Sequence, residues 1–165
     1  MTTHPDYTPE EWKAISEAPV AVALLIVTAD ISGPIGMTQE MVATAKTALE
    51  AGKQSSSALL HSIVASLESK DRSKPERPKV SGKPEEVAQA MIETITADVA
   101  IVEQKAPAEV DAYKSWLMAI AVQVANASRE GGFLGFGGTR VSGGEQAALE
   151  RLATTLGVPP PTIQS

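Results

Sequence analysis

The chain has 165 residues, 43% of them hydrophobic, so it is long enough to bury one substantial core in a single domain. It contains no cysteine, which excludes disulfides, thiolate metal sites, iron–sulfur clusters and cysteine nucleophiles. The net charge of −6 argues against nucleic acid as the main partner, because nucleic-acid-binding proteins usually present a concentrated basic face to the phosphates.

The composition also indicates the fold class. Only 4% of the residues are aromatic, and the apolar content comes from Ala, Leu, Val, Ile and Met, which favours packed helices over a β-sandwich. We therefore expect one all-α domain over residues 1–165, a compact bundle of about six helices. The start of the chain lacks the pattern of a signal peptide. The longest nearly apolar run, 18–29, is shorter than the roughly 20 residues that span a bilayer. These features predict a cytoplasmic protein without a membrane span.

The first helix is predicted to run from residue 8 toward residue 29. Thr8 and Glu11 have the spacing of a capping box. Pro9 suits the first helical position, where its missing amide hydrogen costs nothing. Pro19 lies inside this segment, and we expect it to kink or divide the helix.

Two further helices are predicted before the middle of the chain. Thr38 is a suitable cap for a helix that runs to about residue 51, and Gly52 is well placed to end it. A third helix is expected over about 55–69, because apolar residues recur there at three- and four-residue spacing. Its apolar stripe consists of Leu60, Ile63, Val64 and Leu67.

A basic linker over residues 69–83 separates two halves, about 8–69 and 84–158. It holds six basic and two acidic residues, and Pro75 and Pro78 oppose both a helix and a central strand. A solvated connector of this kind is usually a flexible, solubilising loop. The alternative is a contact site for an acidic partner.

Three helices are predicted in the second half, over about 84–104, 107–128 and from residue 143 onward. Ser142 and Glu145 have the spacing of a second capping box, and Gly157 is placed to end the last helix. The buried stripes of the fourth and fifth helices are expected to be Val87, Met91, Ile95, Val99 and Val102, and then Val110, Tyr113, Leu117, Ile120 and Val124.

A similar pattern occurs twice, in residues 21–49 and 119–156. In each, an apolar helix leads into a glycine-containing loop and a second helix that opens with a carboxylate. The pattern predicts a duplicated helical module with a pseudo-two-fold relationship. Chance similarity between two amphipathic hairpins would leave the all-α fold unchanged. The acids at the corresponding positions are Asp30 and Glu40 in the first copy, then Glu130 and Glu145 in the second.

This arrangement resembles the tellurite-resistance TerB-like family. The residues that carry the resemblance are Thr28, Ala29, Asp30, Gly33, Thr38 and Glu40, then Ala127, Glu130, Gly131, Ser142 and Glu145. The resemblance implies a duplicated all-α fold, a role in stress response, tellurite resistance or phage inhibition, and acidic residues that bind an ion. A non-enzymatic module with a protein partner is therefore the first functional hypothesis. The sequence does not specify an oligomeric state.

The four acids have two interpretations. Hard cations such as Ca²⁺ and Mg²⁺ prefer oxygen ligands, and a loop between two helices can supply them, so Asp30, Glu40, Glu130 and Glu145 are candidate ligands for a divalent cation. The alternative is that Glu40 and Glu145 only cap helix N-termini, where a carboxylate contributes roughly 0.3–1 kcal/mol.

The glycine-rich segment 131–144 supports a second functional hypothesis, a small-ligand or anion-binding protein or an enzyme. It lacks the Gly-Lys-Ser/Thr ending of a P-loop, but Arg140 and free amides near the following helix could hold a small anion. Phe133 and Phe136 are expected to plug the core or, alternatively, to form a partner-binding patch. Catalysis has little other support, because His4 and His61 are the only histidines and His61 flanks an apolar stripe.

Overall fold

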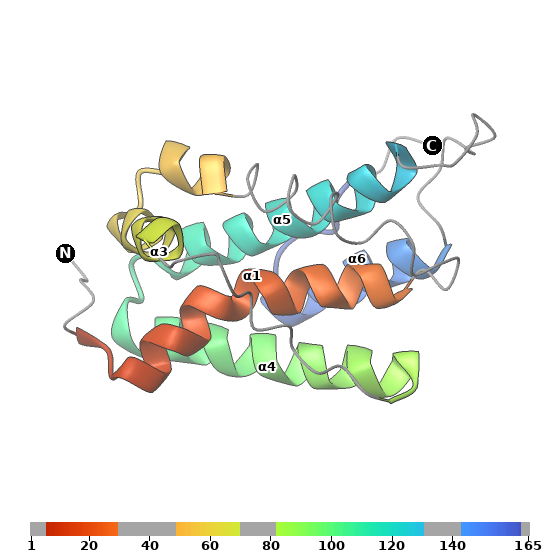
Figure 1. Ribbon diagram of the computed structural model, residues 1–165, viewed down its shortest axis with the longest axis horizontal. Coiled ribbons are helices and arrows are strands. Elements are labelled where there is room, and N and C mark those ends of the chain that lie inside the picture. Colours follow the sequence, from red (N-terminus) through yellow and green to blue (C-terminus); the bar gives the residue numbers. More distant parts are fainter. Residues whose placement is uncertain (1–5, 30–48, 70–81, 131–142, 163–165) are drawn as a thin grey trace.

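A computed structural model describes residues 6–29, 49–69, 82–130 and 143–162, and all regular secondary structure within them is helical. The helices pack into a compact bundle, which confirms the predicted all-α class (Figure 1). Residues 49–54 are helical as well, and the residues before them lie outside the described ranges. The bounds of the other helices are α1 Pro9–Ala29, α3 Ala58–Ser69, α4 Pro84–Lys105, α5 Val110–Glu130 and α6 Gly143–Leu156.

The central helix of the bundle is α1. It packs most extensively against α4, which runs antiparallel to it, and it also contacts α5, α6 and α3 (Figure 1). By length and composition alone, α1 would be long and apolar enough to cross a bilayer, with a mean hydropathy of 1.5, although half of the tested stretch is buried in the bundle. Its apolar character therefore also fits a core helix covered on several sides. Its buried apolar residues are Trp12, Ile15, Ala18, Ala21, Val22, Leu24, Leu25 and Ile26.

The start of α1 confirms the predicted capping box. The Thr8 amide donates to Glu11 Oε2 at 2.8 Å, and the Glu11 amide donates to Thr8 Oγ1 at 3.2 Å. Glu11 also forms an ion pair of 2.8 Å with Lys105 at the end of α4. The cap thus fixes the beginning of α1 and holds it against the C-terminal end of its main partner.

Pro19 does not divide α1, because the helix continues through it to Ala29. Figure 1 shows that the helix changes direction near its middle, as a proline inside a helix predicts. A proline lacks the amide hydrogen that would bind the carbonyl four residues earlier, here that of Ile15. The hydroxyl of Tyr113 in α5 donates to this carbonyl at 2.8 Å. A buried side chain therefore supplies the hydrogen bond that the backbone cannot make.

The prediction that Gly52 ends the second helix is wrong. Residues 49–54 are helical, so the helix passes through Gly52, which is buried. A Cβ at this position would lie 2.6 Å from Val64 Cγ2 and 3.1 Å from Trp116 Nε1. Glycine is required here because α3 and α5 approach the backbone too closely for any side chain.

The third helix begins at Ala58, three residues later than predicted. Ser57 caps it, since the Leu60 amide donates to Ser57 Oγ at 3.2 Å. Glu109, from the turn between α4 and α5, accepts hydrogen bonds from the Ser57 hydroxyl and, at 2.9 Å, from the Leu59 amide. The N-terminus of α3 is thus capped by a carboxylate about 50 residues away in the sequence.

The predicted ends of α4 and α6 are confirmed to within a residue. The Lys83 amide donates to Glu86 Oε2 at 3.0 Å at the start of α4. Gly157 ends α6 with a positive φ of 65°. Its amide donates to the Thr154 carbonyl at 3.2 Å and the Val158 amide to the Ala153 carbonyl at 3.0 Å, the pair of bonds that defines a Schellman motif.

The fifth helix begins later than predicted, at Val110, and ends two residues later than predicted, at Glu130. The Glu109 amide donates to the Ala106 carbonyl at 2.9 Å, so Pro107 lies in the turn between α4 and α5. This turn is what brings Glu109 to the start of α3.

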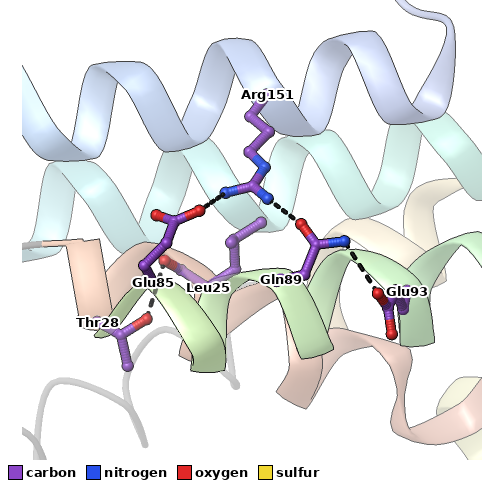
Figure 2. Close-up of polar contacts among 6 residues, drawn as sticks. All are labelled: Leu25, Thr28, Glu85, Gln89, Glu93 and Arg151. Atoms are coloured by element: carbon purple, nitrogen blue, oxygen red, sulfur yellow. Dashed lines mark hydrogen bonds and ion pairs between the residues drawn. The ribbon is translucent and has the colours of Figure 1, made fainter. Parts of the chain in front are cut away.

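A polar network on the surface joins α6 to α4 (Figure 2). Arg151 of α6 lies between Glu85, at 3.0 Å, and Gln89, and Gln89 donates to Glu93 at 2.9 Å. Its members are exposed, apart from the partly covered Arg151, so the network contributes little free energy of folding. Most of the basic linker, nearly all of the second predicted helix and both loops of the proposed duplication lie outside the described residues, so the duplication stays a prediction.

Candidate functional site

Of the four predicted metal ligands, only Glu145 has a described side chain. Asp30 and Glu40 lie outside the described residues, and Glu130 is the last residue of α5, with a side chain that is likewise not described. Glu145 is in the first turn of α6 and is only 2% exposed. Among the described residues, no three His, Asp or Glu side chains gather as they would around a metal ion. The four-acid site therefore stays a prediction.

The helix ends next to these acids lie at the same end of the bundle. The C-terminal ends of α1 and α5 and the first turn of α6 are all at one end of the bundle, on the right in Figure 1. Ala29, which precedes Asp30, and Glu145 thus belong to the same end of the molecule. The other predicted site residues, Phe133, Phe136 and Arg140, lie outside the described ranges, so neither role considered for the glycine-rich segment is tested.

His61 lies on the surface, as its flanking position in the sequence predicts. Its Nε2 is 3.0 Å from the carbonyl of Lys53, near the end of the helical residues 49–54. The Lys53 ammonium in turn pairs with Glu68 at 2.6 Å and with Glu50 at 3.2 Å. These carboxylates, Glu68 first, raise the pKa of Lys53. Lys53, His61 and Glu68 line a shallow pocket of about 280 Å³. Their polar groups already bind one another or the backbone.

A second groove, of about 430 Å³, runs between α5 and the residues that follow α6. Its polar feature is Gln123, whose Oε1 is buried without a hydrogen-bond partner among the described residues. The rest of the lining is mostly apolar and consists of Ser115, Met118, Ala119, Val122, Val158 and Pro159. An apolar groove with one acceptor does not by itself define a ligand.

The most unusual titratable group is Asp98 in α4, which the sequence analysis did not single out. It is 3% exposed, and its Oδ2 has no hydrogen-bond partner in the described part of the chain. Burial raises the pKa of Asp98 to about 7, and the negative charge of Glu17 in α1 adds to the effect. The carboxyl group therefore exchanges its proton near neutral pH.

Two more polar groups belong to the same region of the core. Ser16, next to Glu17 in α1, is 1% exposed, and its Oγ has no hydrogen-bond partner among the described residues. Tyr113 of α5 is fully buried, and burial followed by the charge of Asp98 raises the pKa of its hydroxyl well above the usual range. Tyr113 therefore stays protonated and remains a hydrogen-bond donor.

The signal for Asp98 was present in the sequence. It lies three residues after Ile95 and four before Val102, on the stripe that was predicted to be buried. A carboxylate on such a stripe is uncommon, because burying it costs free energy unless it is paired or protonated. Asp98 is found when every residue at helical spacing along this stripe is considered, polar as well as apolar.

Comparison with known proteins gives no family. No family model matches the sequence, and neither the curated proteins nor the solved structures contain a significant match. Function must therefore be argued from the side chains of this chain, with Glu145 and Asp98 as its two buried carboxylates among the described residues.

Proposed function

We propose that the protein is a non-enzymatic, TerB-like stress-response module that acts through a protein partner and binds a divalent cation through Asp30, Glu40, Glu130 and Glu145. The observation that carries the proposal is the burial of Glu145 in the first turn of α6, at 2% exposure. A helix-capping carboxylate needs no such burial, since the amides at a helix N-terminus are accessible from solvent. Burial also strengthens the attraction between a carboxylate and a cation, and carboxylate oxygens are the ligands that hard cations prefer.

The arrangement of the helices supports the same proposal. The last turns of α1 and α5 and the first turn of α6 lie at one end of the bundle (Figure 1). Asp30 directly follows α1 in the sequence, Glu130 ends α5 and Glu145 is in the first turn of α6, so three of the four acids belong to or directly follow helix ends at this end of the bundle. Oxygen ligands from several segments around one point are what a hard cation requires.

In the described part of the chain, the histidine and lysine most suited to acid–base catalysis are engaged in contacts on the protein surface. His61 contacts the Lys53 carbonyl, and Lys53 pairs with Glu68 and Glu50 on the surface. General acid–base catalysis needs such groups to face a substrate in a common pocket. These contacts favour a binding module over an enzyme.

The test is thermal unfolding of the metal-free protein with and without millimolar Ca²⁺, Mg²⁺ or Mn²⁺. Binding to the folded state alone at 100 times the dissociation constant adds about 2.7 kcal/mol. In a domain of this size, each kcal/mol of added stability raises Tm by about 2–4 °C. Glu145→Gln should abolish the rise, whereas Glu150→Gln, the same change at an exposed site of α6, should retain it. If none of the three ions raises Tm, these acids only cap helix N-termini.

A further inference from the structure

The contact between α1 and α4 contains a carboxylate that the proposed cation site does not use. Asp98 projects from the buried stripe of α4 and is 3% exposed, and its Oδ2 has no hydrogen-bond partner among the described residues. Ser16 Oγ, in the facing helix, is buried without a partner in the same part of the chain. An ionised carboxylate in such surroundings is costly, while a protonated one needs no counter-charge.

The charged groups around Asp98 do not compensate a negative charge. From α1, Glu17 presents a second carboxylate. From α5, Tyr113 donates its hydroxyl to the Ile15 carbonyl. The cations with described side chains on α4, α5 and α6 are held by other acids, in the pairs Lys105–Glu11 at 2.8 Å, Lys114–Glu103 at 2.7 Å and Arg151–Glu85 at 3.0 Å. Lys13 of α1 is exposed. The ionised form of Asp98 would therefore face an apolar stripe and a like charge.

We propose that Asp98 is a proton-operated switch of the contact between α1 and α4: the protonated carboxyl group lets the two helices pack, and loss of its proton loosens α4 from α1. The switch lies in the most extensive helix pair of the bundle. Its charge also acts on Tyr113, whose hydroxyl donates to the Ile15 carbonyl that Pro19 leaves without a backbone partner. A change at Asp98 thus acts on the part of α1 in which the backbone bonds are already interrupted.

The direction of the pH response follows from the raised pKa of Asp98, about 7 instead of 3.8. The folded state holds the proton more tightly than the unfolded state, so the stabilisation is fully present below about pH 4 and is lost as the pH rises to about 7. Each pKa unit is worth a factor of ten in the folding equilibrium. Between these limits the ratio of folded to unfolded protein should fall by up to about a thousandfold.

The experiment is amide hydrogen exchange of wild type and Asp98→Asn at the same pH, once at about pH 4 and once at about pH 8. Asparagine has the shape of the protonated acid and cannot ionise. We expect equal protection at about pH 4, below which the proton-linked stabilisation is complete. At about pH 8, we expect faster exchange in wild type, concentrated in α1 and α4. Asp111→Asn, the same change at an exposed site of α5, should behave as wild type at both pH values.

Equal protection of wild type and Asp98→Asn at both pH values would overturn the proposal. So would a difference at about pH 8 that is no larger in α1 and α4 than in the other helices, because the loss of global stability then accounts for it without local opening of this contact. Glu17→Gln provides a second test if Asp98→Asn does not fold. Removing the like charge should lower the pH midpoint of the wild-type transition by less than about one unit, and an unchanged or raised midpoint would contradict the assignment.

Discussion

The hydroxyl of Tyr113 replaces the amide hydrogen that Pro19 lacks, and Tyr113→Phe removes it with little change in shape. Tyr113 and Ile15 are both fully buried, so water cannot take over the hydrogen bond to the Ile15 carbonyl. A buried carbonyl left without a partner costs about 1–3 kcal/mol. The free energy of unfolding should fall by this amount, and Tm should fall by about 2–4 °C for each kcal/mol.

The assay is urea unfolding followed by circular dichroism at about pH 5, where Asp98 is protonated in the folded state of every variant, so that its contribution cancels from the differences between variants. The informative comparison is a double-mutant cycle with Pro19→Ala. An alanine at position 19 has an amide hydrogen that can reach the Ile15 carbonyl within the helix. Tyr113→Phe should therefore cost at least about 1 kcal/mol less in the Pro19→Ala background than in wild type.

Two results would refute this reasoning. If Tyr113→Phe changes the free energy of unfolding by less than about 0.5 kcal/mol, the hydrogen bond does not carry the predicted energy. If its cost is the same with proline and with alanine at position 19, the hydroxyl acts independently of the interrupted backbone.

Two further substitutions test close contacts between helices. Gly52→Ala should destabilise the protein, because a Cβ 2.6 Å from Val64 Cγ2 costs about 1–3 kcal/mol of overpacking against a gain of at most about 1 kcal/mol in helix propensity. Thermal unfolding should show a smaller loss in the Val64→Ala background, and equal losses would contradict the steric explanation. Glu109→Gln should cost about 1 kcal/mol in urea unfolding, since it removes the negative charge that caps the Leu59 amide and the start of α3. No change in urea midpoint would mean that Ser57 caps α3 alone.

The helices were predictable because their signals are local. Thr8 and Glu11, only three residues apart, form the capping box that starts α1, and Gly157 ends α6 as predicted. Capping and hydrophobic spacing depend on residues within about two helical turns, so the sequence contains all that is needed to place such ends.

The errors came from interactions between distant segments. Gly52 has the composition of a helix stop, but its role is set by Val64 and Trp116, which lie on other helices. The start of α3 depends on Glu109, about 50 residues away. Asp98 was missed because only apolar residues were followed along the stripe of α4. Of the predicted site, Glu145 alone is described, and its burial could not be inferred from its position in a first helical turn.

The central position of α1 has a consequence for synthesis of the chain. The main partners of α1 are α4, α5 and α6, so its most extensive contact is completed only when Lys105 has been made, about 75 residues after Ala29. At roughly 5–20 residues per second, the nascent chain carries α1 without that cover for several seconds. During this time a 21-residue segment with the hydropathy of a membrane span is exposed to chaperones and to the membrane-insertion machinery. Correct folding thus requires that α1 neither aggregates nor inserts into a membrane before residues 84–105 have been synthesised.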